Sequence, residues 1–329
     1  MKAYLFDSFG DPEEVLKLVN VEKPIPKNDE VLVKIKTSAV NDYDWCSITG
    51  TPFSYRLLFG LFKPRKRFSR PGMELAGVVE ATGELAMKFQ AGEAVYGDIS
   101  EKGFGSFAEY LCISEEALEK MPNKMSFEEA ASIPHASMLA VQGLHDVGDI
   151  KQGQKVLING GGGGVGAFGL QLAKRFQAEV TGVDSVRKLQ RMKDFGFDHV
   201  MAYEKTDFTK LDQKFDLILD CKTNRWPFSY LRVLKENGKY VSIGGKSGKL
   251  IQLLIFKPLI ALFSSKQVFM VALKPNKDLD HIDELYQSGV IKCTIDGPYG
   301  FEKTPWAVKY FGEGKHFGKV IIRVNSEDH

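Results

Sequence analysis

A glycine-rich turn between two regular segments constrains this chain more than any other feature of its sequence. Residues Asn159–Gly166 read Asn-Gly-Gly-Gly-Gly-Gly-Val-Gly, so six of the eight positions are glycine. The apolar run Lys155–Ile158 precedes them, and Ala167–Lys174 follows with the apolar period of a helix. The pattern predicts a strand, a tight turn and a helix. A flexible linker would also be rich in glycine, but it would lack these two flanking segments.

Within the turn, Gly161, Gly163 and Gly166 have the spacing G-x-G-x-x-G. In this motif the first glycine permits the turn, the second lets a pyrophosphate approach the backbone, and the third lets the helix pack on the strand. The helix dipole favours an anion at the same place. We therefore expect a dinucleotide here, bound by Gly161, Gly163, Gly164, Val165 and Gly166. A Walker-type phosphate loop is excluded, because no Lys-Ser or Lys-Thr pair follows Gly166.

The chain of 329 residues is long enough for two domains, and its net charge of +2 favours no class of charged partner. The N-terminal segment Met1–Asp7 has too short an apolar core for a signal peptide. The most apolar stretch, Leu250–Phe263, is too short to span a bilayer, so we expect a core or pocket-lining segment and no membrane partner. The four cysteines are far apart and have no C-x-x-C spacing, which favours a cytoplasmic protein with reduced thiols.

The pattern of strands and helices changes along the chain. Short apolar runs separated by glycine and proline occupy the first third and predict a small barrel. After the turn, expected strands at 179–183, 215–220 and 239–243 alternate with expected helices at 186–195 and 227–234, which predicts a parallel sheet. A last strand at 319–324 needs a partner sheet. The expected domains are residues 1–120, 121–265 and 266–329, the last segment returning to the first domain.

Together these regions resemble the medium-chain dehydrogenase/reductase superfamily, and specifically its zinc-free quinone oxidoreductase-like branch. The resemblance covers essentially the whole chain. It is carried by the following segments: Ser38–Asp44, Pro71–Glu80, Val156–Gly166, Gly238–Gly245 and Phe317–Ile322. It implies an α/β protein with a GroES-like β-barrel catalytic domain and a Rossmann domain, a doubly wound parallel sheet. It also implies a cleft between the domains for the nicotinamide and the substrate.

The resemblance bears directly on whether zinc is bound. The zinc branch has a cysteine where this chain has Asn41, and a histidine where it has Met73. Neither an amide nor a thioether is an ordinary zinc ligand. His135 and Glu74 remain as nearby candidate ligands, but a catalytic zinc normally needs three from the protein. We therefore expect no metal, and interpret His135 as a residue that lines or packs under the cleft.

Without a metal, the substrate carbonyl needs a hydrogen-bond donor from the protein. The candidate catalytic residues are Asn41, Tyr43 and Asp44. The resemblance implies that Asn41 lies near the nicotinamide. Tyr43 and Asp44 could instead serve in helix capping and packing, and Asp42 stands where relatives have proline.

The resemblance also implies further cofactor contacts. They are Ser242, Gly244 and Gly245 near the nicotinamide, Lys319 in the closing strand, and Asn224 after the strand at 215–220. Lys319 could equally be an exposed strand lysine. Leu139 stands where relatives commonly have threonine.

The choice between the two nicotinamide cofactors depends on Asp184–Lys188. Asp184 falls at the acidic position that binds the ribose of NAD, whereas Ser185, Arg187 and Lys188 could hold the 2′-phosphate of NADP. The branch mostly uses NADPH, so we expect NADPH and leave NADH open.

Two neighbouring segments have unusual composition. Lys63–Arg70 holds five cations in eight residues, yet a solvated loop is a simpler interpretation than a nucleic-acid patch, so we expect no nucleic-acid partner. The apolar stretch before it, Pro52–Phe62, is placed near the cleft by the resemblance. We expect Phe53, Tyr55, Phe59 and Phe62 to line a substrate pocket, with packing under a loop or a dimer contact as alternatives.

The sequence thus predicts an NAD(P)H-dependent, zinc-independent oxidoreductase that transfers a hydride to a quinone or an α,β-unsaturated carbonyl. A zinc-free aldehyde or ketone reductase, or an alcohol dehydrogenase, is the second interpretation. An NADPH-binding scaffold or RNA-binding protein with little catalysis is the third. The resemblance also implies a homodimer.

Overall fold

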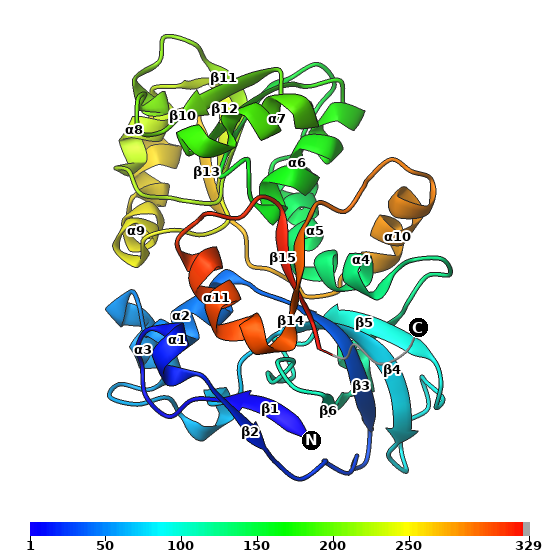
Figure 1. Cartoon of the computed structure of the whole chain (residues 1–329). Coiled ribbons are helices and arrows are strands. Elements are labelled where there is room, and N and C mark those ends of the chain that lie inside the picture. The colour runs from blue at the N-terminus through cyan, green and yellow to red at the C-terminus, as the bar shows by residue number, and fades with distance from the viewer. Residues whose placement is uncertain (325–329) are drawn as a thin grey trace. The chain divides into compact units, whose positions relative to one another are not determined.

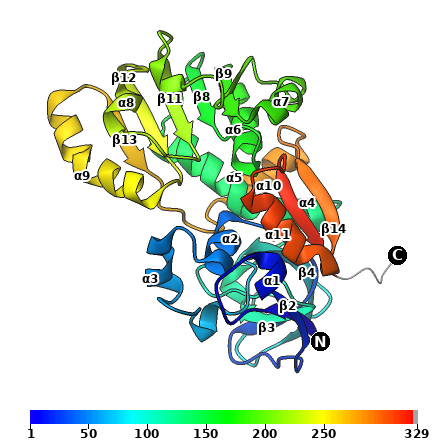
Figure 2. The same ribbon diagram turned by 60° about the vertical axis from the view of Figure 1, so that its left-hand side comes forward.

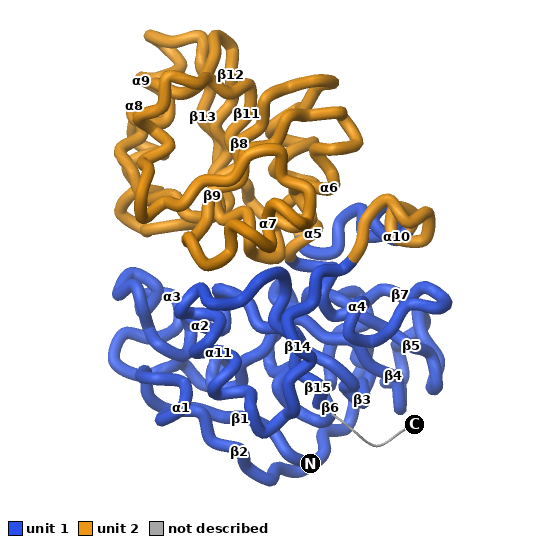
Figure 3. The backbone as a smooth tube through the Cα atoms, turned by 45° about the horizontal axis from the view of Figure 1, so that its top comes forward, with its two compact units in different colours: residues 1–135, 275–283, 293–329 blue, residues 136–274, 284–292 orange. Residues whose placement is uncertain are grey.

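The computed structural model describes residues 1–324, which divide into two compact units (Figure 3). Unit 1 contains residues 1–135, 275–283 and 293–324, and unit 2 contains residues 136–274 and 284–292. Helix α4 (Phe127–Ser132) packs on strands of unit 1, and β13 (Gln267–Met270) pairs within unit 2. Both therefore lie beyond the boundaries at 120 and 265 that the sequence suggested.

Unit 2 is built on six parallel strands in the order β10-β9-β8-β11-β12-β13. With β13 at one edge, the others are β8 (Lys155–Asn159), β9 (Glu179–Asp184), β10 (His199–Ala202), β11 (Phe215–Asp220) and β12 (Leu234–Ser242). This order, 3-2-1-4-5-6 when counted within the unit, is that of a Rossmann domain. The expected doubly wound parallel sheet is therefore confirmed.

Helices pack against both halves of this sheet, the half with β8, β9 and β10 and the half with β11, β12 and β13 (Figures 1 and 2). The helices of this unit are α5 (Pro134–Val141), α6 (Gly164–Arg175), α7 (Leu189–Phe195), α8 (Pro227–Leu231) and α9 (Ser247–Phe263). Helix α6 packs against β8 and β9, and α7 against β10, whereas α8 packs against β12 and α9 against β13. Helix α8 is shorter than expected, because Val233 and Leu234 are buried and β12 already begins at Leu234.

Unit 1 contains a mainly antiparallel sheet in the order β14-β15-β3-β4-β5-β7, with β6 also paired to β3. Its strands are β3 (Glu30–Ala39), β4 (Glu74–Thr82), β5 (Ala94–Asp98), β6 (Tyr110–Ser114), β7 (Glu119–Lys120), β14 (Ile295–Gly300) and β15 (Lys319–Arg323). A separate hairpin joins β1 (Lys2–Leu5) to β2 (Lys17–Asn20). Within residues 1–324 no continuous ladder closes the expected barrel. An isolated bridge between Ala3 and Ala108 links the hairpin to the segment before β6 instead.

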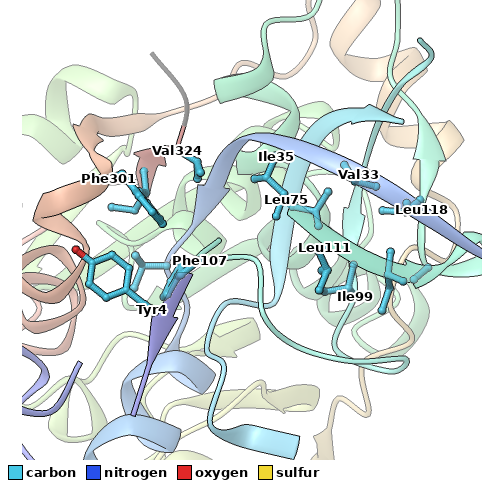
Figure 4. Packing of buried hydrophobic residues seen from close by; sticks show 14 of the residues in the cluster. Tyr4, Val33, Ile35, Leu75, Ile99, Phe107, Leu111, Leu118, Phe301 and Val324 are labelled. Carbon is cyan, nitrogen blue, oxygen red and sulfur yellow. The ribbon is translucent and has the colours of Figure 1, made fainter. Parts of the chain in front are cut away.

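The interior of unit 1 lies between this sheet, the hairpin and the C-terminal segments. Figure 4 shows Ile35 and Leu75 from neighbouring strands, and Tyr4, Phe107 and Phe301 from segments far apart in the sequence. The rings of Tyr4 and Phe301 meet edge to face, with their centroids 5.2 Å apart. The last strand, β15, thus has the partner sheet that the sequence required, because it pairs with β3.

Further helices lie between these strands. They are α1 (Pro12–Val15), α2 (Asp42–Thr49), α3 (Arg56–Phe59), α10 (Leu279–Gln287) and α11 (Thr304–Gly312). Among the helices of the described residues, none combines the length and the apolar character that a membrane span requires.

Helix α9 differs from the expected core segment at 250–263. Only Leu253 and Ile260 of this helix are fully buried, whereas Leu254, Ile255 and Leu262 are exposed. The helix packs against the edge strand β13 and against α8, and its remaining surface is exposed within residues 1–324.

Helix α2 is fixed at its N-terminus by one buried carboxylate, that of Asp44. The carboxylate accepts hydrogen bonds from the backbone N–H of Asn41 at 2.9 Å and from that of Gly72 at 2.8 Å. It therefore ties the start of α2 to the segment that leads into β4. Burial nevertheless raises the pKa of Asp44 to about 7, since a charged carboxylate loses its hydration there.

We predict that the Asp44→Asn variant will lose part of the pH dependence of folding. Because the pKa of Asp44 is higher in the folded than in the unfolded chain, the native state binds the extra proton. The wild-type free energy of unfolding should therefore fall as pH rises from about 4 to about 7, by on the order of 4 kcal/mol in total. Denaturant unfolding at several pH values measures this slope. An unchanged slope in the variant would contradict the assignment.

Candidate functional site

The glycine-rich turn of unit 2 joins β8 to α6. Its left-handed residue is Gly160, with φ +90°, one position before the first glycine of the motif. A Cβ atom on Gly166 would lie 2.5 Å from the carbonyl oxygen of Gly160, so no side chain fits there. Helix α6 begins at Gly164 without a side-chain cap. Its first N–H groups therefore have no side-chain acceptor within residues 1–324, and such groups can receive an anion.

Asp184, at the end of β9, is engaged with the turn itself. Its carboxylate accepts hydrogen bonds from the N–H of Gly162 at 2.9 Å and from that of Ser185 at 2.7 Å. The ammonium of Lys188 lies 3.4 Å from the same carboxylate, and both side chains are buried. Burial lowers the pKa of Lys188, although the charge of Asp184 opposes that shift. Two predicted cofactor residues thus bind each other.

The two remaining residues of this segment are differently placed. The hydroxyl of Ser185 is buried and has no hydrogen-bond partner in the described chain, which is unusual for a buried polar atom. Arg187 is exposed and pairs with no carboxylate among residues 1–324. An unpaired hydroxyl and a free guanidinium are the groups that bind a phosphate ester.

The C-terminal ends of β8, β11 and β12 are joined by a buried network around Asp220. Its carboxylate accepts hydrogen bonds from the amide of Asn159 at 2.7 Å and from the hydroxyl of Tyr240 at 2.6 Å. The hydroxyl of Thr223 lies 2.7 Å from that of Ser242. Burial raises the pKa of Asp220. This network gives the edge where ligands collect in such sheets a fixed shape.

The predicted nicotinamide-side contacts lie at or beside this network. The hydroxyl of Ser242 is buried and points into it. Gly245 bridges to Thr223, and Gly244 accepts a hydrogen bond from the N–H of Thr223. The side-chain oxygen of Asn224 accepts a hydrogen bond from Arg225 at 2.8 Å.

In unit 1, a second cluster surrounds the ammonium of Lys319, which is only 3% exposed. The ammonium lies 2.6 Å from the side-chain oxygen of Asn41 and 2.6 Å from the carboxylate of Glu74. The amide nitrogen of Asn41 donates to the same carboxylate at 2.9 Å. Three side chains from distant parts of the sequence thus form a closed triangle.

Strand pairing explains why these residues meet. The N–H of Val40 donates to the carbonyl of Val320, so Asn41, just after β3, lies against Lys319 at the start of β15. Glu74 begins β4, which pairs with β3 on its other side. Lys319 was predicted as a cofactor contact, and the structure places it beside Asn41, with its ammonium bound to Asn41 and Glu74.

His135 extends the cluster. Its backbone N–H donates to the second oxygen of Glu74 at 2.6 Å, and its ring Nδ1 lies 2.7 Å from the carboxylate of Asp98. Burial by itself would lower the pKa of His135, but the hydrogen bond and charge of Asp98 raise it. Burial would raise the pKa of Asp98, but His135 lowers it. The pair therefore favours the charged forms of both groups.

Glu74 and Asp98 are the residues that sequence reasoning underrated. Glu74 was considered only as a metal ligand, and Asp98 not at all. Each interrupts an otherwise apolar run, at the start of β4 and at the end of β5, and both are buried. A carboxylate in a buried strand needs a partner, and that requirement was the available signal.

The predicted aromatic pocket residues separate into two groups. Phe59 is fully buried, and its ring contacts those of Tyr43 and Phe68 edge to face, at 5.2 and 5.1 Å between centroids. Tyr55 is half-buried and stacks on Phe59, whereas Phe53 and Phe62 are exposed. The hydroxyl of Tyr43 makes no hydrogen bond within the described chain.

Burial raises the pKa of Tyr43, so the hydroxyl keeps its proton. Of the three predicted catalytic residues, Asn41 and Asp44 already use their side chains in hydrogen bonds, whereas Tyr43 has a hydroxyl that can still donate one.

No group of three or more His, Cys, Asp or Glu in residues 1–324 is arranged to hold a metal ion. At the two positions where the resemblance places zinc ligands, the amide of Asn41 binds Lys319, and Met73 is buried.

Comparisons with known proteins agree with this architecture. Residues 27–123 match the family described as alcohol dehydrogenase GroES-like domain, and residues 195–322 match the family described as zinc-binding dehydrogenase.

Individual relatives match nearly the whole chain. A 2-methylene-furan-3-one reductase of Solanum lycopersicum is 33% identical over 98% of this chain and 79% of its own length. An NADPH-dependent alkenal/one oxidoreductase of Arabidopsis thaliana is 29% identical with the same coverage. The structure of the quinone oxidoreductase from Coxiella burnetii aligns over 99% of both chains, with a TM-score of 0.86 and 26% identity. The chain therefore belongs to the medium-chain dehydrogenase/reductase superfamily, in its quinone oxidoreductase-like branch.

Proposed function

We propose that this protein is an NADPH-dependent reductase that adds a hydride to a quinone or to the C=C bond of an α,β-unsaturated carbonyl, without zinc. The observation that carries the proposal is the Lys319–Asn41–Glu74 triangle. It engages the amide of Asn41, at one of the positions where the resemblance places a zinc ligand, with an ammonium ion, and it leaves the hydroxyl of Tyr43 as the available donor. The relatives named for alkenal, furanone and quinone substrates support the substrate class.

The groups in unit 2 fit a nicotinamide dinucleotide. The start of α6 would receive the pyrophosphate, because the space around Gly166 admits no side chain and the first N–H groups of the helix lie there. When bound, the reduced nicotinamide supplies the hydride. Asn159, Asp220 and Tyr240 keep the neighbouring strand ends rigid, which fixes the position of the ligand.

The state of Asp184 supports NADPH over NADH. Both oxygens of its carboxylate already accept backbone hydrogen bonds, and Lys188 neutralises its charge. Asp184 is therefore a weaker acceptor for the ribose hydroxyls of NADH than a free carboxylate would be. It also repels the 2′-phosphate of NADPH less than an unpaired carboxylate would. Ser185 and Arg187 supply the hydroxyl and the guanidinium that a 2′-phosphate needs.

The donor set of unit 1 supports a reaction without zinc. The zinc ligands of proteins are thiolates, imidazoles and carboxylates, whereas an amide and a thioether stand at the matched positions. A conjugated enone or quinone is already electrophilic at carbon. One hydrogen bond to its oxygen, from Tyr43, is therefore enough to stabilise the negative charge that develops there. A simple aldehyde or ketone needs stronger polarisation.

The test of this function is the loss of absorbance at 340 nm when purified protein is mixed with NADPH and a quinone, an enone or an aldehyde, with and without a chelator. We expect turnover of quinone or enone that the chelator does not reduce. Turnover of aldehydes alone would favour the carbonyl reductase, and loss of activity with chelator would contradict the zinc-free proposal. Tight NADPH binding without turnover would favour a binding scaffold.

We predict that Arg187→Ala will raise the KM for NADPH by about tenfold to a hundredfold, because one charge-assisted contact with the 2′-phosphate is lost. The KM for NADH should stay unchanged, since NADH lacks that phosphate. Arg191→Ala, which removes another exposed arginine from the same helical segment, is the matched control. An equal effect on both cofactors would contradict the role of Arg187.

We predict that Tyr43→Phe will lower kcat for an enone by about tenfold to a thousandfold, the usual effect of losing one donor to the developing oxyanion. The KM for NADPH should change little. Tyr55→Phe removes the hydroxyl from a neighbouring half-buried ring and is the control for repacking. If both variants keep full activity, the donor is another group.

Two further features are a homodimer, which the family resemblance implies, and a cytoplasmic location, which the spacing of the four cysteines favours. Light scattering of the purified protein tests the first, and fractionation of the source cells tests the second.

A further inference from the structure

The segment that contains α3 presents apolar side chains to solvent on a well-packed base. Phe62 is 88% exposed, Leu57 65% and Leu58 55%, and Phe53 and Leu61 are exposed as well. We call this surface the α3 patch and define it by the following residues: Phe53, Leu57, Leu58, Leu61, Phe62, Lys63, Arg65, Lys66, Arg67 and Arg70. Helix α3 belongs to unit 1 (Figure 3).

The base of the patch is rigid, so the exposure is built into the fold. Phe59 and Phe68 point inward and meet edge to face, and the backbone N–H of Arg65 donates to the carbonyl of Phe59 at 2.6 Å. The exposed Leu and Phe side chains lie between these buried anchors in the sequence, so the fold itself holds them in solvent. Exposed apolar side chains grouped in this way mark a binding surface.

The charge of the patch has one sign. From Trp45 to Met73 the sequence contains six Lys and Arg residues and no Asp or Glu. The five cations of Lys63–Arg70 are exposed, and within residues 1–324 none of them pairs with a carboxylate. Arg67 lies over the ring of Phe68, and Arg65 donates to the carbonyl of Leu57. The cations are thus held beside the apolar side chains and keep their full charge for a partner.

We propose that the α3 patch binds the surface of a membrane that contains anionic phospholipids. Exposed Leu and Phe side chains insert at the boundary between headgroups and acyl chains, while adjacent Lys and Arg residues bind the phosphates, which is how peripheral proteins attach to lipid. An RNA ligand would use the cations and the rings but gains nothing from Leu57 and Leu58. The sequence analysis expected no membrane partner, because no segment is long enough to span a bilayer. A surface contact needs no spanning helix, so this proposal departs from that expectation.

Helix α9 offers a comparison within the same chain. It also exposes apolar residues, and the sequence has seven lysines and no acid between Glu236 and Asp278. Its exposed helical surface is almost entirely apolar, with Lys249 and Lys257 as its only charges. It therefore tests whether exposed apolar residues suffice or whether the dense cations of the α3 patch are needed.

The experiment is co-sedimentation of the full-length protein with vesicles of phosphatidylcholine, alone or mixed with phosphatidylglycerol. We expect binding to the anionic vesicles about tenfold or more above that to the neutral ones, and weakening as salt is added. Leu57→Ser with Leu58→Ser should reduce this binding about tenfold, and Lys63→Gln with Lys66→Gln should reduce it and its salt dependence.

The matched controls are Leu85→Ser with Met87→Ser, two apolar residues that are 66% and 88% exposed, and Lys17→Gln with Lys27→Gln. Circular dichroism establishes that each variant is folded. Equal binding to both kinds of vesicle, or equal losses in the patch and control variants, would overturn the proposal. Three other results would also overturn it. The first is loss of vesicle binding only in the α9 variant Ile251→Ser with Leu254→Ser. The second is salt-sensitive binding of an RNA oligonucleotide without binding of vesicles, and the third is conversion of a dimer to a monomer by the α3 variants.

Discussion

The buried ammonium of Lys319 is the constraint on which unit 1 depends. An unpaired charge at a site only 3% exposed would cost several kcal/mol, so its two partners must be in place when the chain folds. Those partners, Asn41 and Glu74, follow β3 and begin β4. The ion pair and hydrogen bond therefore fix the register in which the C-terminal strand β15 joins β3, through partners 278 and 245 residues earlier in the chain. The same contacts occupy Asn41, and for this reason the proposed reaction assigns the donor role to Tyr43.

Unit 2 also depends on buried carboxylates that are held by hydrogen bonds and charge pairs. Its parallel strands are apolar on both faces, and their polar groups gather where the strands end. Asp220 is held there by Asn159 and Tyr240, and Asp184 is held by the glycine-rich turn and Lys188. In both units, buried carboxylates accept hydrogen bonds or pair with cations from other parts of the chain. Ser185 and Arg187, which have no such partners within residues 1–324, lie in the segment that we propose binds the 2′-phosphate.

Much of the fold could be predicted because its signals are local. The glycine spacing, the apolar runs at β8, β9 and β11, and the stop at Gly196 each follow from a few neighbouring residues. Short strands such as β10 and β13 carry no such signal, since four residues can be buried in many ways. The candidate site was predicted in part. Asn41, Asp44 and Lys319 were selected by resemblance, but their mutual contacts, and the involvement of Asp98, depend on pairing between distant strands.

The sequence by itself determined the superfamily and the parallel sheet, because a glycine-rich turn between a strand and a helix leaves few alternatives. Only the tertiary structure decided that Asp184 is occupied by its own turn and that Lys319 is a buried partner of Glu74. It also separated the buried Phe59 from the exposed Phe62. These outcomes depend on which segments come into contact when the chain folds. Burial, hydrogen bonding and charge pairing arise from contacts between distant segments, so no single segment of the sequence specifies them.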